Sequence, residues 1–255
     1  MIWPVASTLF GLVIGSFLNV CIYRIPRGES IIKPGSHCPY CLKPIRSYDN
    51  IPVLSYILLG GRCRYCGARI SPRYPLVEIA SAVLALAVLY RFGPGLRFIV
   101  YYAFSCSLLV ITFIDLDHQM IPNSITLGGI IAGIVLNPVL PLSFKDSLLG
   151  LVLGSGTLLM VIYGYLLITG RQGMGGGDVK LLGMIGIFTG WQGVVFTILI
   201  SSLIGSITGI TWIILTKKDM KAAMPFGPFL SLGAIIYIFW GHYLINAYLG
   251  FINPG

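Results

Sequence analysis

The chain has 255 residues, of which 56% are hydrophobic and only 10% are charged. Soluble domains carry about one quarter charged residues, and a mean hydropathy of +0.89 would leave much apolar surface in water. These values exclude a disordered chain, collagen and a coiled coil, and they leave a polytopic membrane protein. The net charge of +9 must then be interpreted from where the lysines and arginines lie along the chain.

Eight apolar segments are candidates for transmembrane helices. They are residues 2–23, 74–90, 98–114, 125–142, 147–168, 179–189, 194–216 and 224–251. The sixth is short, and Gly190-Trp191-Gln192-Gly193 predicts a tight turn before the seventh. We therefore predict an all-α polytopic fold with eight transmembrane helices. Its parts are a first helix over 1–23, a cytoplasmic insert over 24–73 and a seven-helix membrane domain over 74–255.

The positive charges give this arrangement an orientation, because cytoplasmic loops collect Lys and Arg. Nine of the 17 basic residues lie in the insert. If the insert is cytoplasmic and all eight segments cross the membrane, five more basic residues also lie in the cytoplasm: Arg171, Lys180, Lys217, Lys218 and Lys221. Only Arg91, Arg97 and Lys145 are then outside, a ratio of 14 to 3.

Joining residues 179–216 into one span would change that ratio to 11 to 6, so the charges favour the short sixth helix. Both chain termini are predicted to lie outside the cytoplasm. Because topology explains the net charge, nucleic acid is not an expected partner.

The insert contains Cys38-Pro-Tyr-Cys41 and Cys63-Arg-Tyr-Cys66. Two C-x2-C pairs at this separation can supply four thiolates to one tetrahedral Zn²⁺. Disulfides are the alternative, but a reducing cytoplasm disfavours them. We predict a structural zinc site, because four sulfur ligands leave no position open for water. His37 is adjacent but is not needed as a ligand.

Two acids lie at the predicted cytoplasmic edge of the membrane, where a carboxylate is a functional candidate. Asp115 ends the third span, and Asp178 follows the glycines at 175–177. Two facing carboxylates can share one proton, so that one polarises a carbonyl while the other activates water. The alternatives are helix-capping acids with a flexible glycine connector, or a cation relay in a transporter.

The chain resembles the type IV prepilin peptidases, aspartyl proteases of the GxGD class. The resemblance covers most of the chain and is carried by Gly15-Ser16-Phe17-Leu18-Asn19-Val20, Arg24 and Pro26, the two cysteine pairs, Pro72-Arg73-Tyr74-Pro75-Leu76-Val77-Glu78, Asp115 followed by Ile121-Pro122, and Gly175-Gly176-Gly177-Asp178-Val179-Lys180. In the family pattern one catalytic aspartate lies six residues before Ile-Pro, which implies Asp115, and the other is Asp178. Asp117 is the alternate, and Lys180 is a candidate for tuning the charge near Asp178.

The resemblance implies an enzyme of the bacterial cytoplasmic membrane. Such enzymes cut the basic leader of type IV prepilins and pseudopilins after a glycine, at the cytoplasmic face. They then N-methylate the new N-terminal residue from S-adenosylmethionine. Glu78 has two interpretations: an ion pair with Arg73 or another arginine of the insert, or a role in binding the cofactor or the prepilin amine. A proton- or cation-relaying transporter and a zinc-dependent scaffold without catalysis are the rival functions.

Overall fold

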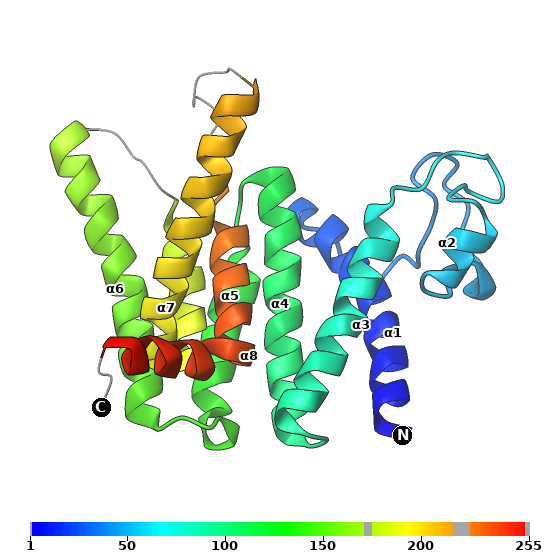
Figure 1. Cartoon of the computed structure of the whole chain (residues 1–255). Coiled ribbons are helices and arrows are strands. Elements are labelled where there is room, and N and C mark those ends of the chain that lie inside the picture. The colour runs from blue at the N-terminus through cyan, green and yellow to red at the C-terminus, as the bar shows by residue number, and fades with distance from the viewer. Residues whose placement is uncertain (1, 171–174, 217–224, 253–255) are drawn as a thin grey trace. The chain divides into compact units, whose positions relative to one another are not determined.

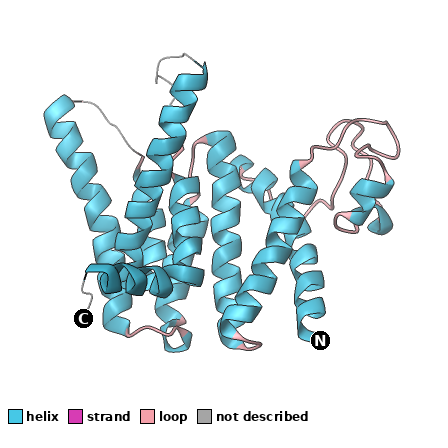
Figure 2. Ribbon diagram, viewed as in Figure 1, coloured by secondary structure: helices cyan, strands magenta, loops and turns pink. Residues whose placement is uncertain are grey.

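The structure is a computed structural model that describes residues 2–170, 175–216 and 225–252. These residues form helices joined by turns, with no strand beyond two isolated β-bridges in the insert (Figure 2). Among the described residues, five helical segments are long and apolar enough to cross a membrane: Ile2–Arg27, Arg73–Phe92, Leu96–His118, Phe144–Thr169 and Gly176–Leu215. The chain is therefore an all-helical, multi-pass membrane protein. The structure does not confirm all eight predicted spans.

The remaining predicted spans differ from the helices for local reasons. Helix α5 (Asn123–Val135) has 13 residues, so it extends about 20 Å and falls short of an apolar bilayer core of about 30 Å. It gives way to the 3-10 helix η3 (Asn137–Val139), because Pro138 lacks the N–H that would continue an α-helix. In α8 (Gly227–Ile252) the apolar helix found is Gly227–Gly241. The predicted basic loops at Arg171 and at residues 217–221 lie outside the described residues.

The described chain divides into two compact units, residues 1–110 and 111–255. The first unit contains α1 (Ile2–Arg24), η1 (Ile25–Arg27), η2 (Ser47–Asn50), α2 (Leu54–Leu58), α3 (Arg73–Phe92) and the first part of α4 (Leu96–His118). Figure 1 shows α2 and its loops gathered at the start of α3.

Helices α1 and α3 of this unit approach closely at two glycines. A Cβ added to Gly11 would lie 2.6 Å from the Ala82 Cα, and one added to Gly15 would lie 2.6 Å from the Glu78 Cα. This is the small-xxx-small packing that brings helix backbones together in membranes. Its consequence is that the α1 side chains next to Gly15 lie beside Glu78.

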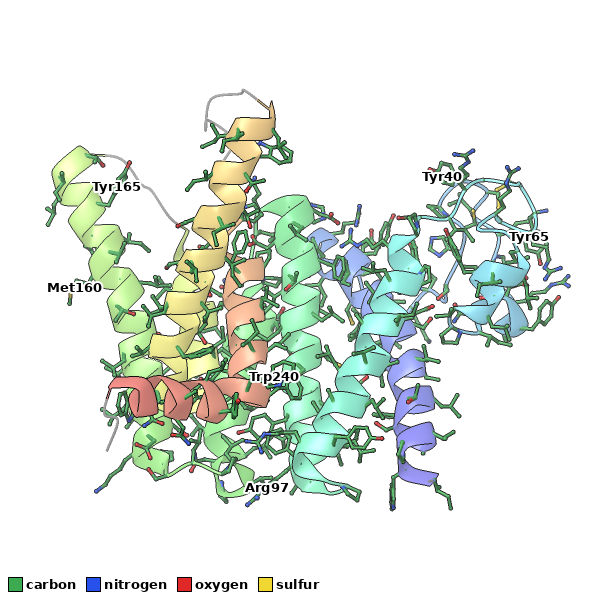
Figure 3. All side chains as sticks on the ribbon, in the orientation of Figure 1. Tyr40, Tyr65, Arg97, Met160, Tyr165 and Trp240 are labelled. Carbon is green, nitrogen blue, oxygen red and sulfur yellow. The ribbon has the colours of Figure 1, made fainter. Side chains whose placement is uncertain are left out.

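The second unit contains the end of α4 followed by α5, α6 (Phe144–Thr169), α7 (Gly176–Thr216) and α8. Gly150 of α6 packs on the Gly186 carbonyl, and Gly154 packs on the Leu182 carbonyl. Residue numbers rise along one helix as they fall along the other, so α6 and the first part of α7 are antiparallel. Exposed side chains of α6 are apolar, as expected for contact with lipid: Met160 is 76% exposed (Figure 3). Leu167 is 86% exposed.

Helix α7 is interrupted at Gly190, whose φ of 71° and ψ of 179° are not helical. Positive φ costs glycine little, because it has no Cβ. The sequence predicted a four-residue turn at this point, whereas the structure has a break at a single residue. A second pairing follows the break. The Ser201 hydroxyl donates to the Phe229 carbonyl at 2.8 Å, and Gly233 packs on the Thr197 backbone, so this part of α7 is antiparallel to α8.

Candidate active site and metal centre

Asp115 lies in the last turn of α4 and is only 5% exposed. The backbone N–H of Gly227, at the start of α8, donates to its Oδ2 atom at 3.0 Å. A Cβ on Gly227 would lie 2.6 Å from the same oxygen. The start of α8 therefore fixes this carboxyl group through backbone that only glycine allows to approach so closely.

Asp178 lies in the first turn of α7, where the positive end of the helix dipole favours a carboxylate. Its carboxyl group is close enough to that of Asp115 for the two to interact electrostatically. Ile121 packs against both sides of the site. A Cβ on Gly177 would lie 2.9 Å from its Cβ, and one on Gly227 would lie 3.3 Å from its Cδ1. Three segments distant in sequence thus meet within the second unit.

The neighbouring polar residues take different positions. Asp117 is exposed, whereas Asp115 is buried, as expected for side chains about 200° apart on a helix. The Lys180 ammonium donates to the Asn123 Oδ1 at 2.8 Å. It therefore links the first turns of α7 to the start of α5, and this contact was not predicted.

The four cysteines of the insert come together, as predicted. Their sulfur atoms all lie within 4.8 Å of one another. The distance is 3.8 Å between the sulfurs of Cys38 and Cys66, and 4.0 Å between those of Cys41 and Cys63. Both distances are far longer than a disulfide bond. They are close to the S···S edge of about 3.8 Å in a tetrahedron whose Zn–S bonds are about 2.3 Å. The cluster could hold a metal ion.

The two cysteine knuckles repeat the same backbone geometry. The Leu42 N–H donates to the Cys38 carbonyl at 2.9 Å, and the Gly67 N–H donates to the Cys63 carbonyl at 2.9 Å. Leu42 and Gly67 both have positive φ, 57° and 70°. Each knuckle is also closed by one isolated β-bridge, His37 to Pro44 in the first and Arg62 to Arg69 in the second. His37 is thus part of a bridge, outside the sulfur cluster.

The surroundings shift the pKa values of two of the cysteine thiols in opposite directions. Backbone N–H groups of Cys66 and Tyr65 lower the pKa of the Cys63 thiol to about 7. The Ala68 N–H favours the Cys66 thiolate, but desolvation and the neighbouring cysteine sulfurs outweigh it and raise the Cys66 pKa to about 11. Four thiolates this close repel one another, and a divalent cation removes that repulsion.

Glu78 lies in the second turn of α3 and is 7% exposed. Its Oε2 accepts a hydrogen bond of 2.7 Å from the backbone N–H of Val53, and Ser16 of α1 lies close to it. In the part of the chain that the structure describes, no lysine or arginine pairs with this carboxylate. The predicted ion pair with Arg73 or another arginine of the insert is therefore not found.

Sequence reasoning missed the residues that hold the candidate groups through backbone atoms. Gly227 was overlooked, although a glycine between Phe226 and Pro228 at the start of an apolar helix is a local signal. Val53 left no such signal, because a backbone N–H does not depend on the side chain.

Comparison with known proteins identifies the family. The profile of the bacterial Peptidase A24 N-terminal domain matches residues 9–92, and that of the type IV leader peptidase family matches residues 102–210. The chain is 37% identical to a Pseudomonas putida protein over 92% of its length and 90% of the relative. It belongs to the type IV leader peptidase family. A Pseudomonas aeruginosa relative is 37% identical, with 96% and 93% covered, and an Aeromonas hydrophila relative is 37% identical, with 94% and 92% covered.

All three relatives are named prepilin leader peptidase/N-methyltransferase. No solved structure matches the chain. The first family region contains the cysteine cluster and Glu78, and the second contains Asp115 and Asp178. Gly227 lies beyond both matched regions. Membership of this peptidase family gives no support to the transporter that the sequence left open.

Proposed function

We propose that this chain is a membrane aspartyl endopeptidase of the bacterial cytoplasmic membrane. It cleaves the leader of type IV prepilins or pseudopilins after a glycine, at the cytoplasmic face, and then methylates the new N-terminal amine. The observation that carries this proposal is the pair of carboxyl groups of buried Asp115 and half-buried Asp178, whose segments meet at Ile121 in a member of the type IV leader peptidase family.

The two aspartates have complementary roles in peptide hydrolysis. Two neighbouring carboxyl groups hold one proton between them more readily than two charges. The ionised carboxylate takes a proton from water, which then attacks the scissile carbonyl, while the protonated carboxyl hydrogen-bonds the carbonyl oxygen. The Gly227 N–H steadies one oxygen of Asp115, so that its carboxyl plane keeps one orientation. Gly177 has no side chain, so Ile121 can pack against the backbone beside Asp178.

Methylation requires a second site for a second substrate. When bound, S-adenosylmethionine supplies a methyl group whose C–S bond breaks as the neutral prepilin amine forms the N–C bond and releases a proton. The residues of this chain must bind the cofactor and orient the amine. Glu78 is the candidate, because it is a buried carboxylate that no lysine or arginine of the described chain neutralises.

The proposed function is tested by incubating purified enzyme in lipid with a panel of prepilins and measuring product masses. Without S-adenosylmethionine, we expect one cut after a glycine. With it, the mature product gains the mass of one methyl group. An intact precursor across the panel, with well-folded enzyme, would contradict the proposal.

We propose that the four-cysteine cluster binds one structural Zn²⁺ per chain. Cys38, Cys41, Cys63 and Cys66 would hold the ion, whose task is to fold the insert. Elemental analysis should find about one zinc per chain. Cys38→Ser should lower this content and the stability of the insert, because structural zinc binding contributes about 10 kcal/mol in small metal-dependent domains.

The matched control is Cys21→Ala, which removes a buried thiol of α1 outside the cluster. It should leave the zinc content unchanged. Metal-replete protein that has intact thiols but no zinc would refute the site. Cleavage should survive Cys38→Ser better than methylation does, because both aspartates lie in the other unit.

We propose that the chain crosses the membrane eight times, with both termini outside the cytoplasm. Helix α7 supports this, because 40 residues would extend about 60 Å if straight, about twice the bilayer core. A reversal at Gly190 divides it into two crossings. In this arrangement the apolar segment 125–142, which continues past α5 through η3, and helix α8 supply the remaining two passes.

Reporter fusions test this orientation. A fusion at Lys145, the second residue of α6, should report the outside. Fusions at Arg171 and Lys218, which lie outside the described residues, should report the cytoplasm. A cytoplasmic signal at Lys145 would overturn the eight-span map.

A further inference from the structure

Helix α2 of the insert has two different faces. Leu54, Ile57 and Leu58 follow the i, i+3, i+4 spacing that places residues on one side of a helix, and they are 49%, 66% and 75% exposed. The opposite side carries residues that line an internal cavity of the first unit: Ser55, Tyr56 and Leu59. We call the exposed face the apolar tip. A patch of exposed aliphatic side chains marks a surface that contacts a protein or a membrane.

Turns on both sides make the apolar tip protrude. Val53, directly before α2, has a φ of 62°, and Gly60 and Gly61, shortly after it, have φ values of 58° and 65°. A positive φ is rare for a β-branched residue and persists only where the surrounding structure enforces it. The chain therefore changes direction before and after α2, and the helix forms a short projection of the insert.

A hydrogen bond fixes the depth of α2 beside the membrane helices. The Val53 N–H donates to the Glu78 Oε2 at 2.7 Å. Glu78 is the sixth residue of α3, so its Cα lies about 7 Å along the helix from that of Arg73. Figure 1 shows α2 level with the first half of α3, within the first unit. Helix α2 therefore lies beside a membrane-spanning helix and does not stand beyond its end.

The surface of α3 at the same level faces lipid. Leu76 and Ile79 lie on either side of Glu78 in the sequence, and both are exposed on a helix that is long and apolar enough to cross a membrane. Interfacial helices bury their apolar faces about 5–10 Å into the boundary between headgroups and acyl chains. Helix α2 begins at that depth, so the apolar tip continues the lipid-facing surface of α3.

Two arginines next to the apolar tip have the charge that suits a lipid headgroup. Arg62 lies one turn beyond α2, where its N–H donates to the Leu59 carbonyl at 3.2 Å. It faces Arg69 across an isolated antiparallel β-bridge, and both residues are exposed. Like charges directly opposite each other in such a pair are destabilising, and among the described residues neither arginine has an acidic partner. A lipid phosphate would remove this repulsion, because guanidinium groups bind phosphate strongly.

We propose that the apolar tip enters the leaflet at the Arg73 end of α3, with Arg62 and Arg69 bound to anionic lipid headgroups above it. In the eight-span topology this is the cytoplasmic leaflet. The bilayer then holds the insert at a third point, besides its connections to α1 and α3. This anchoring depends on the surface of the insert and not on prepilin cleavage or methylation.

Fluorescence quenching by spin-labelled lipids tests the depth of the apolar tip. An environment-sensitive fluorescent amino acid replaces Leu58 in the full chain, in nanodiscs of phosphatidylcholine and phosphatidylglycerol. The matched control places the same amino acid at Tyr40, which is also 75% exposed but lies at the far end of the insert from α2 (Figure 3). At position 58 we expect blue-shifted emission and stronger quenching by nitroxides on the upper acyl chain than by a water-soluble nitroxide. At position 40 we expect the reverse.

The same probe at position 58 measures the preference for anionic headgroups. At equal mole fractions, spin-labelled phosphatidylglycerol should quench it more than spin-labelled phosphatidylcholine does. Arg62→Gln should lower the relative association constant of the anionic lipid about fivefold, and the double variant with Arg69→Gln should remove the preference. The control is Lys145→Gln, which removes one exposed positive charge from the other unit and should keep the preference.

Four results would overturn the proposal. A probe at position 58 that behaves like the probe at position 40 would show that the tip lies in water. Blue-shifted emission without quenching by any lipid would mean that protein, such as a second copy of the chain, covers the tip. Loss of lipid quenching when prepilin is added would make the substrate the occupant. Equal quenching by the two lipids in the chain with unchanged arginines would refute the headgroup contacts.

Discussion

Replacing either aspartate of the pair, in Asp178→Asn or in Asp115→Asn, should reduce prepilin cleavage about 10³-fold or more, to background. An amide cannot take a proton from water, and it cannot share one proton with the remaining carboxyl group. General acid–base groups contribute about 10² to 10⁴ each, so the loss of a shared proton removes most of the chemistry. Cleavage of a prepilin by membranes that contain equal amounts of each variant measures the effect.

The double variant should cost no more than either single variant, because residues that act as one unit are not additive. The control is Asp117→Asn, two residues from Asp115 but exposed, which should remain close to full activity. If Asp117→Asn were inactive and Asp115→Asn active, the catalytic aspartate of α4 would be Asp117 and not Asp115. Activity in Asp178→Asn would remove the aspartyl mechanism.

The pH dependence of cleavage should follow from the same pair. The rate should fall at low pH, where both carboxyl groups are protonated and none can accept a proton from water. It should also fall at high pH, where both are ionised and none can donate. The decreases at low and at high pH both belong to the coupled pair and not to one residue each. Each single variant should therefore lose both of them. A rate that rises steadily with pH would contradict a shared proton.

The cysteine cluster was predictable from sequence because its geometry is local. A C-x2-C spacing brings two sulfurs to one side of a tight turn, and two such turns need only to face each other. The structure repeats the turn twice, with Leu42 and Gly67 in the same left-handed conformation. Helical periodicity also predicted that Asp115 and Asp117 lie on different faces of α4, and the structure buries the first and exposes the second.

Other features depend on contacts between segments that are distant in sequence. The spacing of residues in a single sequence does not predict such contacts. The partner of Glu78 within the chain is a backbone N–H 25 residues away, whereas the partners that the sequence suggested within the chain were arginines. The partner of Lys180 is Asn123, 57 residues away. The extent of α5 was misjudged for a different reason: hydrophobicity continues past Pro138, but helical hydrogen bonding does not.

Gly227 gives the second large expected effect, because its hydrogen bond to Asp115 joins residues 112 positions apart. In Gly227→Ala, the new methyl group would lie 2.6 Å from the Asp115 Oδ2 and 3.3 Å from the Ile121 Cδ1. The carboxyl group must rotate or the start of α8 must move, and either change misaligns the aspartate pair. A misplacement of about 1 Å at a catalytic group costs about 100-fold in rate, so we expect cleavage to fall by about that factor.

The matched control is Gly209→Ala in α7, where an added Cβ meets nothing within 4 Å. It makes the same chemical change in a helix of the same unit, and it should leave cleavage unchanged or slightly improve stability, because alanine favours helix over glycine. Prepilin cleavage and the thermal midpoint should be measured for both variants. We expect Gly227→Ala to lose activity while it keeps a cooperative unfolding transition, because the altered contact is to a single carboxyl group. Full activity in Gly227→Ala would mean that the orientation of Asp115 does not depend on α8.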